Sequence, residues 1–356
     1  MNILLQLSHP AHYHLFKHTV GELIDHGHQV HILIKTKDIL EDLLQNSGLP
    51  YCNILPNAHR HSKLGIGWDM LVRDWRMIQY VYRHNIDILI GSTCEVAQVG
   101  WLTRRMRINF GEDDASIVPL YFKSIHPFAQ CILSPVSCNN GDLESRTIHY
   151  RGFHKLAYLH PNRFHAERAV VDRYFDSSKP YFLIRFALLT AHHDDGIHGF
   201  STDVAQRLID LLTPHGRVFI TSERPLEPIF EQYRLKINPL DIHHVMAFSS
   251  MYIGDSQSMA VEAAMLGVPG IRFNDFAGRI GVLEELEHTY HLTVGIPSNQ
   301  PERLLTQVRE WLNDPSLLDT FANRRQRMLA DKIDVAAFFT WFIENYPESK
   351  EKRWTP

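Results

Sequence analysis

The feature that most constrains this fold is an alternation of short apolar segments with longer amphipathic ones, which runs along the chain in two series. Short apolar runs bounded by turn residues predict buried strands, and the amphipathic runs between them predict helices. Such alternation favours βαβ units around a parallel sheet, whose ligands bind at the carboxyl ends of the strands. In the first series the expected strands are residues 3–8, 29–34, 51–55, 87–91, 107–110 and 129–134, and the expected helices are 14–26, 37–46, 68–83 and 95–106.

The second series begins after two polar segments, LHPNRF and DSSKP. We therefore predict an α/β chain with two Rossmann-like, doubly wound domains, residues 1–160 and 161–335. Residues 336–356 are expected to form a C-terminal helix that packs back on the first domain. The expected strands of the second series are 181–186, 218–222, 251–254, 270–273 and 292–295, and the expected helices are 202–212, 242–248, 258–266, 278–288, 302–312, 316–329 and 335–344.

Charge and cysteine usage exclude several classes of function. The chain has 356 residues with 36 basic and 40 acidic side chains, so it lacks the basic excess that nucleic-acid binding requires. No apolar stretch approaches the ~20 residues of a membrane span. The opening NILLQLS is short and has no basic flank of a signal peptide. The four cysteines show no zinc-site spacing, so we expect a cytoplasmic protein with free thiols.

The segment MYIGDSQSMAVEAAMLGVPG, residues 251–270, predicts a phosphate site. A buried strand ends in small polar residues, and Ser256, Gln257 and Ser258 then open a helix. Backbone N–H groups at a helix N-terminus lack helical partners and attract anions, and the serine hydroxyls add donors. Glu262 lies one turn after Ser258 on the same helix face, where its carboxylate can accept bonds from the two hydroxyls of a ribose. The alternative is a serine N-cap followed by a solvated glutamate.

This segment resembles the nucleotide-diphosphate signature of GT-B-fold sugar enzymes. It is similar to the Asp-Ser-Gly-Gly…Glu-Glu-Ala run of the non-hydrolysing UDP-N-acetylglucosamine 2-epimerases. The resemblance implies that Ser256 contacts phosphate and that Glu262 grips the ribose. Gln257 and Ser258 replace the two glycines, which implies a less close backbone approach to the phosphate.

A second segment, LLTAHHDDGIHGF, is similar to the Thr-x-His-Arg-Arg-Glu-Asn run of the same epimerases. Thr190 and His192 match that run, whereas His193 and Asp194 stand in place of its arginines. The resemblance implies that His192 and His193 lie at the nucleotide. The lost arginines argue against the epimerase reaction itself.

Nearly the whole chain also resembles the domain of unknown function number 354 family. The segments that carry this resemblance are LSHPAHYHLFKH, LAYLHPNRF, DIHHVMAFSSMYIGDSQSMAVEAAMLGVP, NDFAGRIGVLEELE and DKIDVAAFFTWFIENYP. The resemblance implies the GT-B fold, in which two Rossmann-like domains face a central cleft.

The loop SHPAHYH follows the first strand, where the GT-B fold places donor phosphate or acceptor. Ser8 is expected to bind phosphate. His9 and His12 can donate to an anion or act as a base, because histidine titrates near neutral pH. We expect no metal at His14 and His18, because no acidic third ligand stands nearby.

Carboxylates follow two other strands of the first series. Glu112 and Asp113 follow the strand at 107–110, and Glu95 follows the strand at 87–91. Crowded carboxylates raise one another's pKa and can act as a general acid or base. In the resembling epimerases, acids at comparable places act on the sugar. The alternative is that these acids only stabilise helix N-termini.

Arginines end two strands of the second series. Arg185 and Arg272 carry planar guanidinium forks that suit a diphosphate. Each can instead pair with a nearby aspartate, Asp194, Asp195 or Asp275. The run WLTRRMR, residues 101–107, is either a solvated basic helix end or a contact with the inner face of the membrane.

The favoured function is a GT-B-type glycosyltransferase-like enzyme of surface glycan or polysaccharide biosynthesis. It takes a nucleotide-diphosphate sugar, most simply UDP-linked, as donor substrate and transfers the sugar to an acceptor. Its acceptor base is expected among His9, His12 and Asp113, and it is expected to need no metal or other cofactor. The alternatives are a non-hydrolysing UDP-N-acetylglucosamine 2-epimerase and a non-catalytic nucleotide-sugar binding protein.

Overall fold

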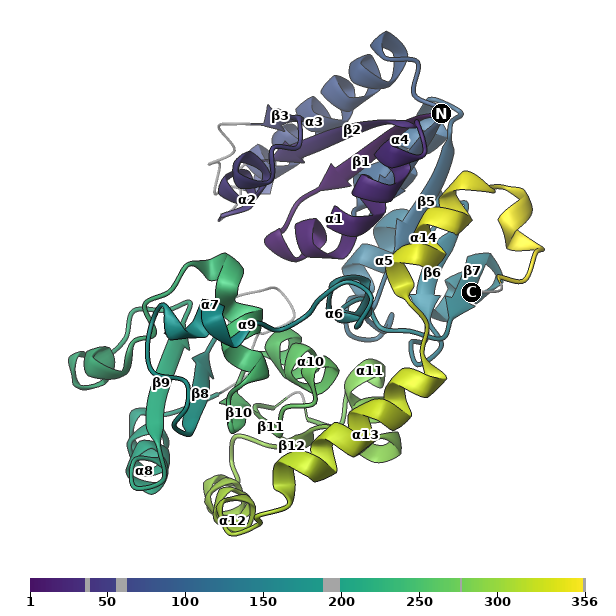
Figure 1. Ribbon diagram of the computed structural model, residues 1–356. Helices are drawn as coiled ribbons and strands as arrows, with labels where there is room; N and C mark the ends of the chain where they lie inside the picture. Colours follow the sequence, from purple (N-terminus) through teal and green to yellow (C-terminus); the bar gives the residue numbers. More distant parts are fainter. Residues whose placement is uncertain (36–38, 56–62, 188–198, 276, 355–356) are drawn as a thin grey trace. The chain divides into compact units, whose positions relative to one another are not determined.

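The computed structural model of the chain describes residues 1–35, 39–55, 63–187, 199–275 and 277–354 (Figure 1). The chain divides into two compact units. The first unit comprises residues 1–158 and 333–356, and the second comprises residues 159–332. The boundaries expected from the sequence, after residues 160 and 335, lie within a few residues of these. Each unit is an α/β layer structure built on a parallel sheet, as predicted.

The first unit contains, within its described residues, a seven-stranded parallel sheet in the order β3-β2-β1-β4-β5-β6-β7. Its inner strands are almost fully buried, because helices cover both faces of the sheet. This burial explains their continuous isoleucine and leucine runs. The strands are β1 (Asn2–Leu7), β2 (Gln29–Lys35), β3 (Tyr51–Leu55), β4 (Ile88–Gly91), β5 (Met106–Phe110), β6 (Ile132–Pro135) and β7 (Thr147–Tyr150).

Helices cover the two faces of this sheet in two groups. On one face α1 contacts α2 and α14, and on the other face α3 contacts α4, which contacts α5 (Figure 1). Helix α14 is fixed by aromatic packing, because the ring of Phe339 lies 4.7 Å from that of Phe110 at a T-shaped angle. The helices are α1 (Pro10–Asp25), α2 (Leu40–Ser47), α3 (Lys63–Arg83), α4 (Cys94–Leu102), α5 (Pro119–Ile125), η1 (Gly141–Arg146), α6 (Leu156–Leu159), α14 (Val335–Glu344) and η5 (Glu348–Lys350).

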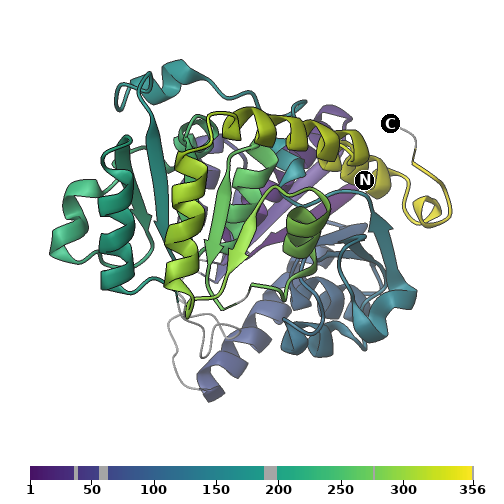
Figure 2. The same cartoon turned by 90° about the horizontal axis from the view of Figure 1, so that it is seen from below.

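The second unit contains, among the residues described, a five-stranded parallel sheet in the order β12-β11-β10-β8-β9 (Figure 1 and Figure 2). Helix α10 contacts α9 and α13, whereas α8 contacts α12. The strands are β8 (Tyr181–Phe186), β9 (Arg217–Ser222), β10 (Met251–Gly254), β11 (Gly270–Phe273) and β12 (Val294–Ile296). The helices are α7 (Arg168–Asp172), α8 (Thr202–Leu212), η2 (Pro228–Tyr233), η3 (Pro239–Asp241), α9 (Ile242–Ala247), α10 (Gln257–Leu266), α11 (Gly281–Glu284), η4 (Glu285–Thr289), α12 (Pro301–Leu312) and α13 (Leu317–Asp331).

Several elements differ from those expected; the short helices α5, α6 and α7, for example, were not predicted. The helix predicted over 95–106 ends at Leu102, because Thr103 bonds back to the Val99 carbonyl at 2.7 Å and Arg104 takes a left-handed φ of 56°. Edge strand β7 was missed, since its TIHY sequence is only partly buried. The helix predicted over 278–288 begins later and continues as the π-helix η4. No helix within the described residues combines the length and the apolar composition needed to cross a membrane.

Candidate nucleotide site in the second unit

The strand order of the second unit places a topological switch point between β8 and β10. Strand β8 connects through α8 to β9 on one side, whereas β10 connects through α10 to β11 on the other. Chain connections that diverge in this way leave a crevice at the carboxyl ends of the two strands, where ligands of open α/β sheets bind. Arg185 of β8 pairs in register with Gly254 of β10, and the Asp255 N–H donates to the Arg185 carbonyl at 3.3 Å. Arg185, Asp255 and the start of α10 therefore lie at this switch point.

The N-terminus of α10 has the geometry expected of a phosphate site. Ser256 is the N-cap, in extended backbone conformation, and its Oγ accepts the Met259 N–H at 3.5 Å. The Ser256 carbonyl accepts the Ala260 N–H at 3.3 Å. Helix geometry therefore leaves the N–H groups of Gln257 and Ser258, in the first turn, without a helical acceptor. Ser258 is exposed and Gln257 half-buried, so this end of the helix is open to a ligand.

Asp255 holds the connection between β10 and α10 in place through buried hydrogen bonds. It is 1% exposed, and its Oδ1 accepts the Ala187 N–H at 2.6 Å. Asn274 donates to its backbone carbonyl at 2.8 Å. A Cβ on Gly199 would stand 2.4 Å from Asp255 Oδ2, so only glycine fits there. Burial raises the pKa of Asp255 to about 6.

We expect Asp255→Asn to raise the free energy of unfolding by about 2–3 kcal/mol near pH 7.5 and to change it little near pH 4. The pKa is raised in the folded protein, so this carboxyl destabilises the fold progressively as pH rises from about 4 to 6. Asparagine has the shape of the protonated acid and removes that penalty. Urea unfolding at several pH values measures it, with the exposed Asp319→Asn as control. A pH-independent difference would contradict the assignment.

Glu262 lies in the middle of α10, whose other faces are buried. Its Oε1 is 3.2 Å from Nε2 of His243 on α9, and the two side chains are 12% and 7% exposed. A carboxylate this buried requires a hydrogen-bonded partner, and His243 supplies one. A carboxylate oxygen can accept more than one hydrogen bond, so pairing with His243 and binding of a ribose hydroxyl are compatible. Ser258 and Glu262 share one helix face, as predicted from their spacing.

The two predicted diphosphate arginines differ in their surroundings. Arg185 donates through Nη2 to Glu223, whose half-exposed carboxylate forms a screened and weak pair. Arg272 is 0% exposed, with Nη2 2.6 Å from Glu287 and 3.6 Å from Glu284. The structure does not support the predicted diphosphate role of Arg272, because its guanidinium is buried in this ion pair. The partners are glutamates, not the aspartates that the sequence indicated.

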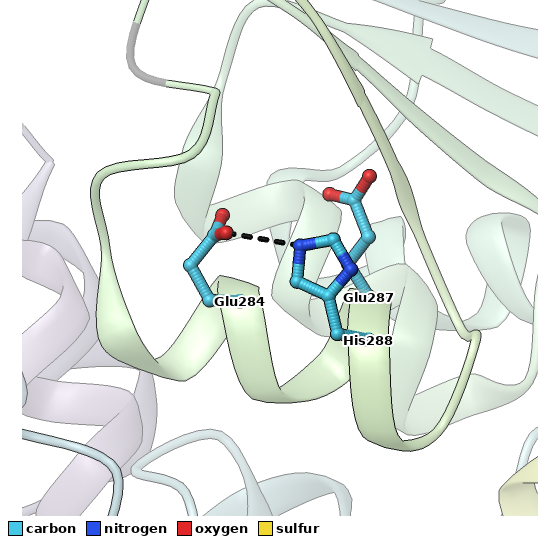
Figure 3. Close-up of side chains that lie close together, drawn as sticks. All are labelled: Glu284, Glu287 and His288. Atoms are coloured by element: carbon cyan, nitrogen blue, oxygen red, sulfur yellow. Dashed lines mark hydrogen bonds and ion pairs between the residues drawn. The ribbon is translucent and has the colours of Figure 1, made fainter.

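The two glutamates that pair with Arg272 also belong to the one group of described residues that could hold a metal ion. Glu284, Glu287 and His288 each offer a ligand atom, and these atoms lie within 4.8 Å of one another (Figure 3). His288 Nε2 is 3.1 Å from a Glu284 oxygen, and Glu287 also accepts the Gly295 N–H at 2.9 Å. Because the Arg272 guanidinium already supplies positive charge to both carboxylates, we assign no metal to this cluster.

The first unit has a similar switch point, between β1 and β4, and Ser8, His9 and His12 follow β1 there. His9 is exposed and caps α1, because its Nδ1 accepts the Ala11 N–H at 3.1 Å. Nδ1 of His12 accepts the Ser8 N–H at 3.3 Å. A neutral imidazole that accepts at Nδ1 carries its proton on Nε2. Both rings therefore present a donor, which favours anion or hydroxyl binding over the base role.

Glu95 does not lie where a sugar-directed acid is needed. It is 3% exposed in α4 and forms a buried ion pair with Arg73 of α3. The prediction of a catalytic Glu95 is therefore not supported, because its carboxylate is committed to the packing of two helices. Burial, and next the charge of Glu95, raises the pKa of nearby Asp74 to about 6.

Glu112 is likewise held by neighbours of its own unit. Its carboxylate accepts from Lys155 Nζ and from the His154 N–H, both at 2.5 Å. Burial alone would raise the pKa of Glu112, but the nearby Lys155 charge and hydrogen bonds outweigh it and hold that pKa below its ordinary value. A lowered pKa contradicts the predicted use of Glu112 as a raised-pKa acid. Asp113 is exposed and stays a candidate.

Some predicted residues lie outside the described part of the chain, and some functional candidates were missed. His192 and His193 fall in the segment 188–198, which the structure does not describe. His243 was missed because it lies on a different helix from Glu262, so no spacing signal links them. Asp255 follows its strand directly, and its position in GDSQS was the available signal.

Comparisons with known proteins agree with this architecture. No protein-family model matches the chain, so none supports the resemblance to the domain of unknown function number 354 family, and no curated protein matches it either. Solved structures do match over almost the whole length. UDP-GlcNAc 2-epimerase from Neisseria meningitidis, bound to UDP-GlcNAc, aligns with a TM-score of 0.68 and 12% identity, covering 99% of this chain and 100% of the other.

Two further structures show the same likeness. The S. aureus MnaA–UDP co-structure aligns with a TM-score of 0.70 and 12% identity, covering 100% of this chain and 99% of that one. Spinosyn rhamnosyltransferase SpnG, complexed with spinosyn aglycone, aligns with a TM-score of 0.63 and 14% identity, covering 97% and 100%. The chain therefore has the GT-B fold, with two Rossmann-like domains, that glycosyltransferases and UDP-GlcNAc 2-epimerases share.

Proposed function

We propose that this chain is a GT-B-type glycosyltransferase-like enzyme that uses a nucleotide-diphosphate sugar. The observation that carries the proposal is the helix N-terminus of α10, open to a ligand after β10 and one turn from the Glu262–His243 pair. A nucleoside diphosphate has its negative charge and its ribose hydroxyls at a comparable separation. The fold is shared with proteins solved with UDP-GlcNAc and with UDP.

The second unit supplies groups for the donor sugar nucleotide. The N–H groups of Gln257 and Ser258, the hydroxyls of Ser256 and Ser258, and the α10 dipole stabilise the diphosphate. Arg185 adds its guanidinium when the phosphate replaces the half-exposed Glu223 as its partner. During transfer the acceptor oxygen attacks the anomeric carbon, and the bond from that carbon to the diphosphate oxygen breaks. The diphosphate leaves with the bonding electrons, and these donors stabilise its charge without a metal.

The first unit supplies groups for an acceptor hydroxyl. His9 and His12 hold it or a phosphate through their Nε2–H donors, because their Nδ1 atoms accept backbone N–H groups. The exposed carboxylate of Asp113 then takes the hydroxyl proton. We propose a role in surface glycan or polysaccharide biosynthesis, in the cytoplasm.

A 2-epimerase is the second candidate, favoured by the TM-score of 0.68 to the Neisseria meningitidis UDP-GlcNAc 2-epimerase against 0.63 to the rhamnosyltransferase. Epimerisation at C2 requires acids beside the sugar ring, and the predicted ones are engaged. Glu95 is buried against Arg73, and Glu112 is paired with Lys155. We therefore rank transfer above epimerisation. A non-catalytic binder would use the same donor site and is distinguished by turnover alone.

The test is incubation with UDP-N-acetylglucosamine in heavy water, followed by proton NMR. A 2-epimerase breaks the C2–H bond and returns solvent hydrogen to C2, whereas a transferase breaks only the anomeric C–O bond. We expect no deuterium at C2 and release of UDP when a suitable acceptor is added. The control is an active epimerase in the same buffer. Deuterium at C2 would reverse the ranking, and absence of both signals with bound UDP would indicate the binder.

A further inference from the structure

Helix α3 presents an apolar face that the described residues of the first unit leave exposed. Trp68, Leu71, Trp75 and Tyr82 are each more than half exposed, at 58%, 66%, 59% and 57%. Their spacing of three, four and seven residues places them along one side of the helix. The opposite side of the helix packs into the core of the first unit, where Met77 and Val81 are 0% exposed. Helix α3 is thus apolar on both its inner and its outer side.

The neighbouring helix α4 also ends in exposed apolar side chains. It packs beside α3, on the same face of the sheet, and ends with Trp101 and Leu102, which are 50% and 53% exposed (Figure 1). Single exposed apolar residues are ordinary, but clustered ones mark an interaction surface. Three of these six side chains are tryptophans. Their flat indole rings, each with one N–H donor, suit a boundary between an apolar and a wet phase.

The exposed charges described on α3 and in the turn after α4 are positive. On α3 they are Arg76 and Arg83. Nη1 of Arg76 also donates to the Ile54 carbonyl of β3 at 2.7 Å, whereas no bond among the described residues ties Arg83 to the sheet. Arg104 is exposed in the turn after α4. The acids of the described part of α3, Asp69 and Asp74, are half-buried. This arrangement is that of an interfacial helix, with aromatic residues directed inward to lipid and arginines at the level of the headgroups.

We propose that the outer face of α3 and the end of α4 dock this protein on an anionic lipid surface. A second copy of the chain fits the surface less well. A two-fold interface uses the same patch from both copies. It would therefore bring the arginines of the two copies together, and the described part of α3 has no exposed acid to neutralise them. Anionic lipid headgroups supply the missing negative charge. The proposal does not depend on the nucleotide site, which lies in the second unit.

The test is flotation of the full chain with lipid vesicles. We expect binding to vesicles of phosphatidylcholine with phosphatidylglycerol, weaker binding to phosphatidylcholine alone, and loss of the difference at high salt. Trp68→Ser with Trp75→Ser should lower the partition coefficient by about tenfold or more. Arg83→Gln with Arg104→Gln should remove the preference for anionic lipid.

Control variants alter equally exposed residues elsewhere. Ile229→Ser and Leu318→Ser, at positions that are 51% and 53% exposed, should bind vesicles as the wild type does. Light scattering of the same samples reports oligomeric state. Absence of vesicle binding by the wild type, or unchanged binding by the double tryptophan variant, would overturn the proposal. A wild-type dimer that the tryptophan variant converts to monomer, with no vesicle binding, would identify a second copy as the occupant instead.

Discussion

Glu95→Ala is expected to lower the free energy of unfolding by about 3–5 kcal/mol, because it leaves the Arg73 guanidinium buried without its carboxylate. The two side chains are only 4% and 8% exposed, and they join α4 to α3. Water cannot replace the lost partner at this depth, so the charge of Arg73 destabilises the folded state. Urea unfolding followed by circular dichroism measures the change.

Two further variants make this result specific. Arg73→Met combined with Glu95→Leu removes both charges and should be much less destabilising than Glu95→Ala, because apolar replacement of a buried pair is often neutral. Asp319→Ala removes an exposed first-turn acid of α13 and should cost less than about 1 kcal/mol, the size of a helix-dipole effect. A Glu95→Ala protein as stable as the wild type that has lost turnover would return Glu95 to the catalytic candidates.

Glu262→Ala is expected to weaken binding of UDP by about 1–3 kcal/mol, the range for hydrogen bonds to a charged group. The carboxylate is positioned by His243 and lies one turn inside the helix whose N-terminus is the proposed diphosphate site. Calorimetry with UDP measures the loss, and thermal unfolding of the unliganded variant reports any structural effect. Glu310→Ala, on the exposed side of α12, is the control and should leave UDP binding unchanged.

Comparison of UDP with its 2′-deoxy analogue and with pyrophosphate tests whether Glu262 contacts the ribose. The wild type should bind UDP more tightly than its 2′-deoxy analogue, and Glu262→Ala should abolish this difference, since the carboxylate accepts from the missing hydroxyl. Pyrophosphate affinity should stay the same in the variant, because the α10 N-terminus is unchanged. Equal losses for UDP and pyrophosphate would show that Glu262 acts through the helix. Equal UDP affinity in both proteins would refute the ribose contact.

Local pattern was sufficient where one segment carries its own determinants. The alternation of apolar and amphipathic runs predicted two parallel sheets, because side-chain periodicity follows directly from strand and helix geometry. The segment 251–270 predicted β10, the Ser256 cap and α10 for the same reason. In each case the residues involved are neighbours in the chain, so spacing alone fixes which side chains share a face.

Pairing between distant segments was beyond local pattern. Glu95 and Glu112 look like equivalent acids after strands, yet each is bound by a cation that the chain brings from elsewhere, Arg73 of α3 and Lys155 before α6. Arg185 and Arg272 both end strands, but Arg185 meets a half-exposed Glu223 and Arg272 is sealed with Glu287. Spacing cannot predict such partners, because they are separated by whole secondary-structure elements.

Local sequence was therefore enough to predict the two-sheet architecture, the strand–DSQS–helix junction with its Ser256 cap and the position of Glu262 one turn inside that helix. The tertiary structure alone decided which of the candidate side chains are available to a ligand. It placed His243 against Glu262 and fixed the Nδ1 atoms of His9 and His12 as acceptors. It also buried Arg272 and Glu95 in ion pairs. The reason is physical: backbone periodicity is encoded locally, whereas the desolvation and pairing that set the chemistry of a charged group depend on what the fold packs around it.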